Sequence, residues 1–538
     1  KSRTILPFSR DAQRSAGLAP ALRCASRLNG RSAYVLVVVL IVIVVLSLVA
    51  YRFTDAMSAE AEVAHRSREA AQARAHAVSG IHYAAGMLAD ANALNGTLGG
   101  NPFDAPAAFS GVKLGTDRDP HGGGRFSVVS VADTFSGSGE SRYAVRYGVT
   151  DEGGKLNINA LIQLDDTGEK LHDALMKLPD MTADIADAVV DWVDPDDDPR
   201  PAGAESGYYS GLANPYLCKN GPLSSLEELL LVRGVTPRLL FGTDRNRNGV
   251  LDPGEDDGGG FSRGWSDFLT VYGREVDVDS AGSPRINVND DEDVPGTNAK
   301  LAAAVGQDMA DYLTYYRLGG KTKKAGSTGT GGKPPVVVGA DQLRAAVEAK
   351  LAATPIPSKA VKSVLSFANT QITLPRPPTA KSTDPDTVVL CPLNDPARLK
   401  ELLPKLLEST TTRTDFEMAP RVNVNTAAPE VLAGIPGLTD ADVQAIQSAR
   451  PNLSPTDPAT TTGAWLVTQA NLTVDKFKGI EKYVTGRTQV YRVHSVGYFA
   501  TGGPVARVEA VIDVNQGHPR IVYFRDLTDL GRGFELAR

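Results

Sequence analysis

The sequence predicts an α+β fold in which a long amino-terminal helix packs on an antiparallel sheet, with a large, mainly helical region inserted between the strands. Three observations predict it. An apolar run at residues 34–50 continues without Gly or Pro into a stretch rich in helix-forming residues that reaches about residue 94. Segments in which apolar and polar residues alternate lie near both ends of the remaining chain, and short helical patterns lie between them.

The apolar run, Tyr34–Ala50, is the predicted membrane anchor. Seven basic residues and one acid precede it, so the positive-inside rule places residues 1–33 in the cytoplasm and the rest of the chain across the membrane. A helix over residues 34–95 would be roughly 90 Å long, so only its first third fits within the hydrocarbon core of a bilayer. A cleaved signal peptide is the competing interpretation, but no helix breaker follows the run where a peptidase needs an extended chain.

The strands of the predicted sheet are divided between two parts of the sequence. Residues 125–132 and 142–149 precede the helical region, and residues 489–498, 506–514 and 520–525 follow it. Most of these segments alternate with a period of two, as antiparallel strands with one face on a core do. We therefore divide the chain after the stalk helix into 96–170 for the first strands, 171–483 for the inserted helical domain and 484–538 for the last strands. Residues 319–335 are rich in Gly and predict a flexible linker within the insertion.

Three short motifs echo one another. Lys155–Ala160, Arg285–Asp290 and Arg421–Thr426 share the order basic, apolar, Asn, β-branched, Asn, which predicts a short strand whose second Asn caps the next element. Helices at helix-hairpin-helix spacing come after the first and third motifs. Such hairpins bind DNA phosphates in other proteins, and residues 434–437 would be the candidate loop. Two aspartates follow this loop, and their negative charge would repel a phosphate. We therefore expect these hairpins to pack against protein.

Residues 244–255 match the calcium-loop template at every position. Oxygen-bearing side chains stand at positions 1, 3, 5, 9 and 12, with Gly at position 6. The predicted ligands are Asp244, Asn246, Asn248, the backbone carbonyl of Val250, Asp252 and Glu255. A solvated acidic turn is the alternative, because two arginines reduce the negative charge of the loop. A single loop with a dissociation constant of ~10⁻⁴ to 10⁻³ M would be occupied in millimolar calcium.

A second acidic cluster lies at residues 191–205. Its candidate metal ligands are Asp191, Asp194, Asp196, Asp198 and Glu205. Their spacing matches no metal-binding template, and a solvated loop braced by prolines is an equally good interpretation. This cluster is therefore a second candidate metal site.

Composition narrows the class of protein. The 538 residues, 42% hydrophobic and 22% charged, indicate several globular parts rather than a membrane protein with many spans. A net charge of −7 argues against nucleic acid as a partner. The histidines are scattered and no Gly-x-Ser-x-Gly elbow is present, which leaves an enzyme without support. Cys218 and Cys391 are compatible with one disulfide or with two buried thiols.

The amino-terminal layout resembles type IV pilins and pseudopilins, in which a leader is cut before the apolar run and the run stays as the anchor. By this resemblance Ala33 ends the leader and Tyr34 begins the mature protein, with Gly30 as the alternative site. Most such proteins have a Glu at the fifth mature position, where it pairs with the amino terminus of a neighbouring subunit. Here that position is Val38. The missing Glu and residues 155–234 resemble the K subunits of the type II secretion system.

This resemblance implies a minor pseudopilin that caps the tip of a periplasmic pseudopilus and supports the export of folded proteins. It implies an inner-membrane protein, processed by a prepilin peptidase and methylated, with no enzymatic activity. Its implied partners are other minor pseudopilins, with the secretin and secreted proteins as further contacts. Two alternatives stay open: a type IV pilus-associated adhesin or pilin-like DNA-uptake protein, and a single-pass membrane protein with an extracellular calcium-binding domain.

Co-expression with a prepilin peptidase should yield a mature chain that begins at Tyr34, because the basic leader is removed while the apolar run stays attached. Edman or mass-spectrometric sequencing of the purified protein measures the new amino terminus, and expression without the peptidase is the control. A chain that begins after residue 50 would identify an ordinary signal peptide and contradict the resemblance to pseudopilins.

Overall fold

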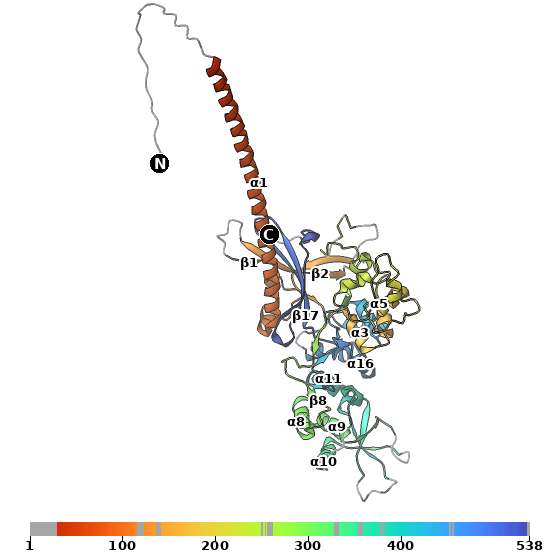
Figure 1. The fold of residues 1–538 in the computed structure, drawn as a ribbon. Helices are drawn as coiled ribbons and strands as arrows, with labels where there is room; N and C mark the ends of the chain where they lie inside the picture. Colours follow the sequence, from red (N-terminus) through yellow and green to blue (C-terminus); the bar gives the residue numbers. More distant parts are fainter. Residues whose placement is uncertain are drawn as a thin grey trace, which may run out of the picture. The chain divides into compact units, whose positions relative to one another are not determined.

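The structure, a computed structural model, has a mixed α+β fold (Figure 1). It describes residues 30–115, 123–135, 141–248, 251–252, 254–255, 262–327, 333–352, 359–376, 379, 381, 384–450, 453–454 and 457–534, except for the side chains of 30–33 and 131–144. The chain divides into two compact units, Lys1–Arg68 and Glu69–Arg538. The predicted α+β class, with a long apolar helix and an antiparallel sheet, is confirmed.

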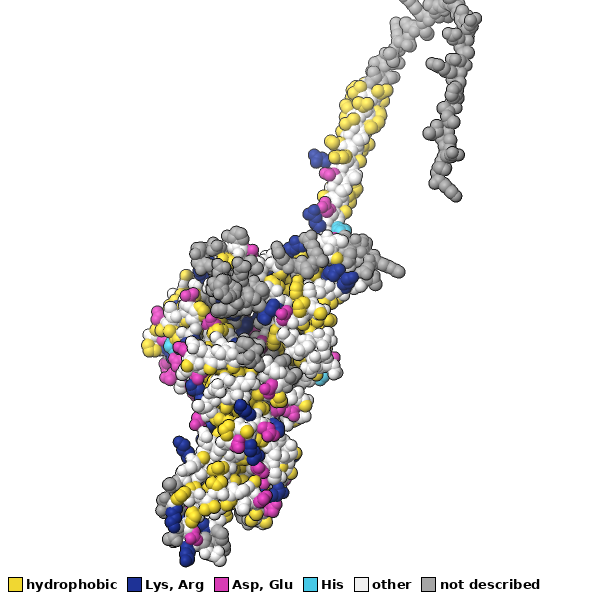
Figure 2. Space-filling view, turned by 180° about the vertical axis from the view of Figure 1, so that it is seen from behind, with side chains coloured by type: hydrophobic (Ala, Val, Ile, Leu, Met, Phe, Trp, Pro, Cys, Tyr) yellow, Lys and Arg dark blue, Asp and Glu magenta, His cyan; other side chains and the backbone are white. Residues whose placement is uncertain are grey.

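Helix α1 extends over Gly30–Ala89. Within the described residues it is the one helix long and apolar enough to cross a membrane. The side chains of Tyr34–Ala50 are exposed, and Figure 2 shows hydrophobic side chains gathered on this part of α1. The helix ends before the predicted residue 94 because the side chain of Asp90 accepts a hydrogen bond from the backbone N–H of Asn92 at 2.8 Å. A short π-helix, η1 (Ala93–Thr97), follows.

The second unit contains a seven-stranded antiparallel sheet built from both sides of the insertion (Figure 1). Its strands are β1 (Val112–Leu114), β2 (Gly124–Phe135), β3 (Ser141–Arg146), β4 (Thr150–Asp151), β17 (Val490–Phe499), β18 (Ala506–Asp513) and β19 (Arg520–Asp526). The main path is β1-β2-β17-β18-β19, while β3 also pairs with β2 and β4 with β17. Because β2 and β4 pair with β17, the insertion leaves and rejoins the sheet at neighbouring strands.

The carboxy-terminal part of α1 packs on one face of this sheet. The buried side chains that it contributes are mostly small, including Ala73, Ala77 and Ala84. They allow the backbone to approach β17 so closely that a Cβ at Gly497 would lie 2.1 Å from the carbonyl oxygen of Ala73. The opposite face carries the charged side chains of Arg492, Arg507 and Glu509 and the imidazole of His494, which are covered by the inserted region. The sheet therefore has an apolar face and a charged face.

The inserted region consists of three equivalent repeats, and each contains one of the echoing motifs. Each motif forms a two-residue strand that pairs in parallel with a second short strand farther along the chain. The pairs are β5 (Leu156–Asn157) with β6 (Leu269–Thr270), β8 (Ile286–Asn287) with β13 (Thr410–Thr411), and β15 (Val422–Asn423) with β16 (Val484–Thr485). One hydrophobic core runs through all three repeats.

The basic residue of each motif has the same role in its repeat. It forms an ion pair with a carboxylate of low exposure and donates a hydrogen bond to a carbonyl just before the second strand. The contacts are Lys155 with Glu152 (3.4 Å) and Ser266 O (2.9 Å), Arg285 with Asp277 (3.1 Å) and Glu408 O (3.0 Å), and Arg421 with Glu275 (3.0 Å) and Glu481 O (3.5 Å). The beginning and the end of each repeat are therefore joined by a side chain as well as by the strand pair.

The prediction that the second Asn of each motif is a cap is wrong. The first Asn makes the local turn: Asn157 caps helix α3 (Ile158–Leu164) by accepting from the N–H of Ala160 at 3.0 Å. The second Asn faces a distant loop, where its amide satisfies backbone groups. These contacts are Asn159 with Leu223 N and O, Asn289 with Val361 N and O, and Asn425 with Thr460 O and Gly486 O.

The repeats differ in what lies between their paired strands. The first holds α3, α4 (Glu169–Leu175), α5 (Ala183–Val193), α6 (Ser206–Tyr209), the 3-10 helices η2 (Leu226–Leu231) and η3 (Trp265–Asp267), and α7 (Pro237–Phe241). The second holds α8 (Val294–Val305), α9 (Gln307–Arg317), α10 (Ala340–Leu351), α11 (Pro396–Ser409) and a sheet of β9 (Lys321–Lys324), β10 (Val336–Val337), β11 (Thr370–Thr373) and β12 (Thr387–Leu390). The third holds α12 (Pro429–Ala433), α13 (Asp440–Ala449), α14 (Pro458–Thr462), α15 (Trp465–Thr468) and α16 (Val474–Ile480).

Two features of the insertion differ from the sequence prediction. A four-stranded sheet stands inside the second repeat, and β7 (Glu275–Val276) pairs with β14 (Glu417–Met418) between repeats, so the region is not purely helical. The predicted flexible linker at 319–335 is wrong for residues 321–324, which pair as β9 with β11. Residues 328–332 of that linker lie outside the described residues.

Glu152 fastens the sheet to the first repeat directly after β4. Its carboxylate accepts two hydrogen bonds from Arg492 of β17, at 2.8 and 2.6 Å, and one from Thr270 of β6 at 2.6 Å. Burial alone would raise the pKa of Glu152, but the charges of Arg492 and Lys155 outweigh it and lower this pKa to about 2.

Because the folded-state pKa of Glu152 lies below its ordinary value of 4.5, its ionised form stabilises the fold above that value. This stability is lost as the pH falls from 4.5 toward 2, and it amounts to about 3 kcal/mol. Urea unfolding of Glu152→Gln, followed by circular dichroism between pH 6 and 2, should show a smaller loss of stability on acidification than the parent. Glu169→Gln, at an exposed carboxylate, should keep the loss seen in the parent, and equal losses in all three proteins would contradict the assignment.

Candidate metal sites

The candidate calcium loop lies between α7 and η3, against the charged face of the sheet. Its described side chains turn toward one another. Asp252 Oδ2 accepts from Asn246 Nδ2 at 2.6 Å and from Asn248 Nδ2 at 3.0 Å. Glu255 reaches back across the loop and accepts from the N–H of Asn246 at 2.9 Å and from the N–H of Asp252 at 3.3 Å. The structure therefore brings the predicted ligands at positions 3, 5, 9 and 12 together.

The remaining predicted ligands bear on whether the loop could hold a calcium ion. Asp244, at position 1, accepts from the N–H of Asn248 at 3.0 Å and so belongs to the same group. Val250 lies outside the described residues. Asn246 Oδ1 is buried and has no hydrogen-bond partner within the described part of the chain. A hard cation such as Ca²⁺ would satisfy this oxygen, so the residues fit the ion that the sequence predicts.

The second acidic cluster forms a compact group at the end of α5. One carboxylate oxygen each from Asp194, Asp196 and Glu205 lies within 4.8 Å of the others. Asp194 and Glu205 are buried, and three of their four oxygens, Asp194 Oδ1 and both of Glu205, have no hydrogen-bond partner in the described residues. Buried carboxylates without partners are costly, and an oxygen-preferring divalent cation would satisfy them.

Burial controls the protonation of this group. It raises the pKa of Glu205 to about 7 and that of Asp194 to about 6, and the charges of nearby aspartates add to both shifts. The low-dielectric surroundings include Trp192, whose ring lies 5.1 Å from that of Tyr209, and Tyr209 in turn stacks on Tyr216 at 5.2 Å. Because a metal ligand has to be deprotonated, we expect cation binding here to strengthen as the pH rises through 7.

The other two residues predicted for this site have different roles. Both oxygens of Asp191 accept from the N–H of Arg200 at 3.3 Å, so this buried carboxylate braces the loop that carries the group. Asp198 is exposed and donates its N–H to Asp196 Oδ1 at 3.0 Å. The structure thus assembles Asp194, Asp196 and Glu205, with Asp191 beneath them and Asp198 outside the group.

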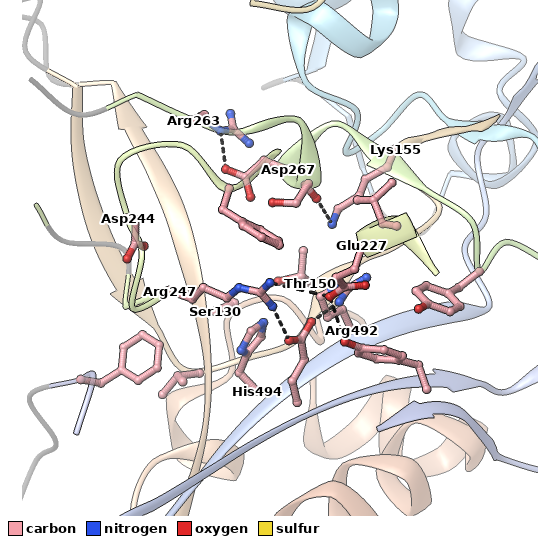
Figure 3. Close-up of a pocket in the computed structure, with 18 of the residues that line it drawn as sticks. Ser130, Thr150, Lys155, Glu227, Asp244, Arg247, Arg263, Asp267, Arg492 and His494 are labelled. Atoms are coloured by element: carbon pink, nitrogen blue, oxygen red, sulfur yellow. Dashed lines mark hydrogen bonds and ion pairs between the residues drawn. The ribbon is translucent and has the colours of Figure 1, made fainter. Parts of the chain in front are cut away.

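A cavity of about 180 Å³ lies between part of the calcium loop and the charged face of the sheet (Figure 3). Asp244 and Arg247 line it from the loop, and Arg492 and His494 line it from β17. Burial lowers the pKa of His494 to about 4, so this imidazole is neutral at pH 7. The sequence analysis did not predict this group of buried polar and charged side chains between the loop and the sheet. The signal in the sequence was the presence of charged residues at same-face positions of otherwise apolar strands.

The two cysteines of the described residues, Cys218 and Cys391, are buried free thiols. Burial raises the pKa of both to about 12, which suppresses the reactive thiolate. Of the two alternatives that the sequence left open, the structure has the pair of buried thiols.

Comparison with protein families matches residues 154–241 to the model described as type II secretion system (T2SS), protein K. Over residues 154–241 the chain is therefore similar to this family. The match covers the first strand of the first repeat, the acidic group and η2, and it ends before the calcium loop. The sequence-based resemblance to this family is confirmed over this segment.

Two further comparisons concern the whole chain. A search of curated proteins finds no match to the chain. Among solved structures, the chain is similar to a chain of the GspK-GspI-GspJ complex from the enterotoxigenic Escherichia coli type 2 secretion system. The similarity covers 86% of this chain and 98% of that one, with 11% sequence identity and a TM-score of 0.37.

Calorimetric titration of the full-length protein in detergent should detect two calcium ions, one in the loop at residues 244–255 and one in the acidic group of Asp194, Asp196 and Glu205. Glu255→Gln, which removes a carboxylate ligand, should abolish or weaken only the loop site, and Glu205→Gln only the acidic site. Calcium at a hundredfold excess over its dissociation constant stabilises the native state by about 2.7 kcal/mol per site, so each variant should lose part of the calcium-induced rise in melting temperature.

The matched control is Glu169→Gln, an exposed carboxylate in the same repeat, which should bind as the parent does. The acidic site should bind more tightly at pH 8 than at pH 6. If both variants bind two ions with the affinities of the parent, the loop is only a turn and the acidic group only a buried cluster.

Proposed function

We propose that the chain is a minor pseudopilin K of the type II secretion system that acts mechanically rather than as an enzyme. The observation that carries this proposal is the match of residues 154–241 to the protein K family, within an insertion that interrupts an antiparallel sheet on which the long helix α1 packs. In this role the apolar run is a single-pass anchor in the inner membrane, and the rest of the chain lies in the periplasm.

The proposed place of the protein is the tip of the pseudopilus. Val38 has no carboxylate and cannot form the pairing through which a subunit docks beneath one already in the filament. The insertion between β4 and β17 is also much wider than a helix of about 10–12 Å, so it would obstruct a subunit stacked above it. Both features suit a subunit with no neighbour above.

The proposed partners follow from these surfaces. Other minor pseudopilins would pack along α1 and the sheet. The carboxy-terminal part of α1 already packs on the apolar face of the sheet, whereas the earlier part of this helix is exposed. The inserted repeats would face the secretin or the exported protein. A prepilin peptidase would remove the leader, and bound calcium would have a structural role in the first repeat.

Photo-cross-linking in secreting cells tests this arrangement. A cross-linking residue at Val63, which is 67% exposed on α1, should capture other minor pseudopilins, because helices meet there in the filament. One at Leu217, which is 71% exposed in the first repeat, should capture the secretin or an exported protein but no subunit of the shaft. Mass spectrometry identifies the captured proteins. Capture of the major pseudopilin along the whole shaft from Leu217 would rule out the tip position.

The variant Val38→Glu provides the control for this experiment. A cap has no pairing to restore, so this variant should secrete no better than the parent and should give the same cross-links. Improved secretion would place the protein in the filament body, and surface display or DNA uptake instead of secretion would favour the adhesin alternative.

A further inference from the structure

Arg507 of β18 points from the charged face of the sheet into the calcium loop. Its side chain is almost fully buried. Nη1 donates to the carbonyl of Asn246 at 2.9 Å and Nη2 to the carbonyl of Arg247 at 2.8 Å, while Cζ lies 5.0 Å from the ring centroid of Phe534. A planar guanidinium presents two nitrogens at a fixed spacing to two successive carbonyls, whereas lysine has a single nitrogen on a flexible chain.

These partners are unusual for a buried arginine. Burial lowers the pKa of Arg507 to about 10, although the negative charges of Asp244 and Glu509 oppose this shift. The groups that accept from its guanidinium are nevertheless loop carbonyls. A buried cation of this kind is tolerated only where its acceptors are held in place. Arg507 is therefore satisfied in its buried position only while residues 246–247 keep the conformation that turns their carbonyls toward it.

Arg247 also attaches the loop to the sheet, but its side chain extends from the loop to β18. Its φ of 56° lies in the left-handed region, which is strained for a residue with a Cβ. Its guanidinium pairs with Glu509 of β18 at 3.2 Å and with Glu227 of η2 at 3.7 Å, and it stands 4.4 Å from the ring centroid of Phe241. These contacts fix the fourth position of the loop, since such strain persists only where the surroundings impose it.

The two arginines thus hold the backbone between two candidate ligands. The backbone carbonyl of Asn246 accepts from Arg507, and its side-chain oxygen has no hydrogen-bond partner among the described residues. Asn248 Nδ2 donates to the carbonyl of Gly533 at 3.3 Å. We infer that Arg507 is a positioning residue for the cation loop, so that ion binding by the loop and attachment of the loop to the sheet stabilise one another. This coupling is reciprocal by thermodynamic necessity. The inference rests on the calcium loop of the proposed pseudopilin.

Calcium titration of the full-length protein tests the inference in a Glu205→Gln background, which leaves the loop as the candidate site to be measured. Arg507→Lys keeps the charge but replaces the two fixed guanidinium nitrogens with a single nitrogen, so we expect the dissociation constant for calcium to rise about tenfold. Arg520→Lys is the matched control, because Arg520 lies on β19 of the same sheet and donates to Asp513 at 2.7 Å, so it shares no partner with Arg247. It should bind calcium as the background protein does.

A purely structural role for Arg507 predicts a different pattern. The melting temperature would then fall by the same amount with and without calcium, and the calcium-induced rise would be unchanged. Positioning predicts that this rise shrinks in Arg507→Lys but not in Arg520→Lys. It also predicts that calcium slows hydrogen exchange at the amides of Arg247 and Asn248 in the background protein and does so less in Arg507→Lys.

A second variant covers the case in which Arg507→Lys does not fold. Phe534→Leu keeps the guanidinium and removes the ring beside it, and it should weaken calcium binding about threefold. An unchanged dissociation constant in folded Arg507→Lys, or in Phe534→Leu where the first variant does not fold, overturns the inference. So does a background protein whose loop binds no calcium. Neither result bears on the pseudopilin proposal, which the cross-links decide.

Discussion

The junction at Asp151 and Glu152 is the contact on which the rest of the second unit depends. Here the chain leaves the sheet, and β17 returns beside it. Asp151 accepts hydrogen bonds from Asn423 and Thr426 of the third repeat and from Thr488 just before β17. Glu152 joins Arg492 of the sheet to Thr270 of the first repeat. Two adjacent buried carboxylates therefore connect the sheet to the first and last repeats, and replacing either would leave several buried donors without acceptors.

The parts of the fold that depend on local periodicity were predictable from the sequence. The apolar run of α1 and the alternation in β17 and β18 identify their elements without knowledge of any partner. The short strands of the three motifs were predicted for the same reason. The roles of their asparagines were not, because the second Asn of each motif bonds to a loop far away in the sequence, such as that of Asn289 to Val361. Local capping rules cannot identify such a contact.

The same distinction applies to the candidate sites. Both metal-binding candidates were found because their ligands lie within about a dozen residues, where a template or a cluster is visible. The charged network was not found because its partners are far apart: Arg492 and Glu152 are separated by 340 positions, and Arg247 and Glu509 by 262. The calcium loop resembles an independent module in the sequence, yet in the fold its backbone is held by β18. The pattern of its candidate ligands was visible in the sequence, and its contacts with the sheet were not.

The three repeats share a joint between their two ends. A pair of two-residue strands and a basic side chain close each repeat, and an amide from the same motif bonds to a loop inside it. The second repeat encloses a four-stranded sheet and the third only short helices, yet their joints match. Chain can therefore be added or lost inside a repeat without disturbing its neighbours. Such an architecture can acquire new surface, including sites for ions or other proteins, one repeat at a time while its attachment to the sheet stays the same.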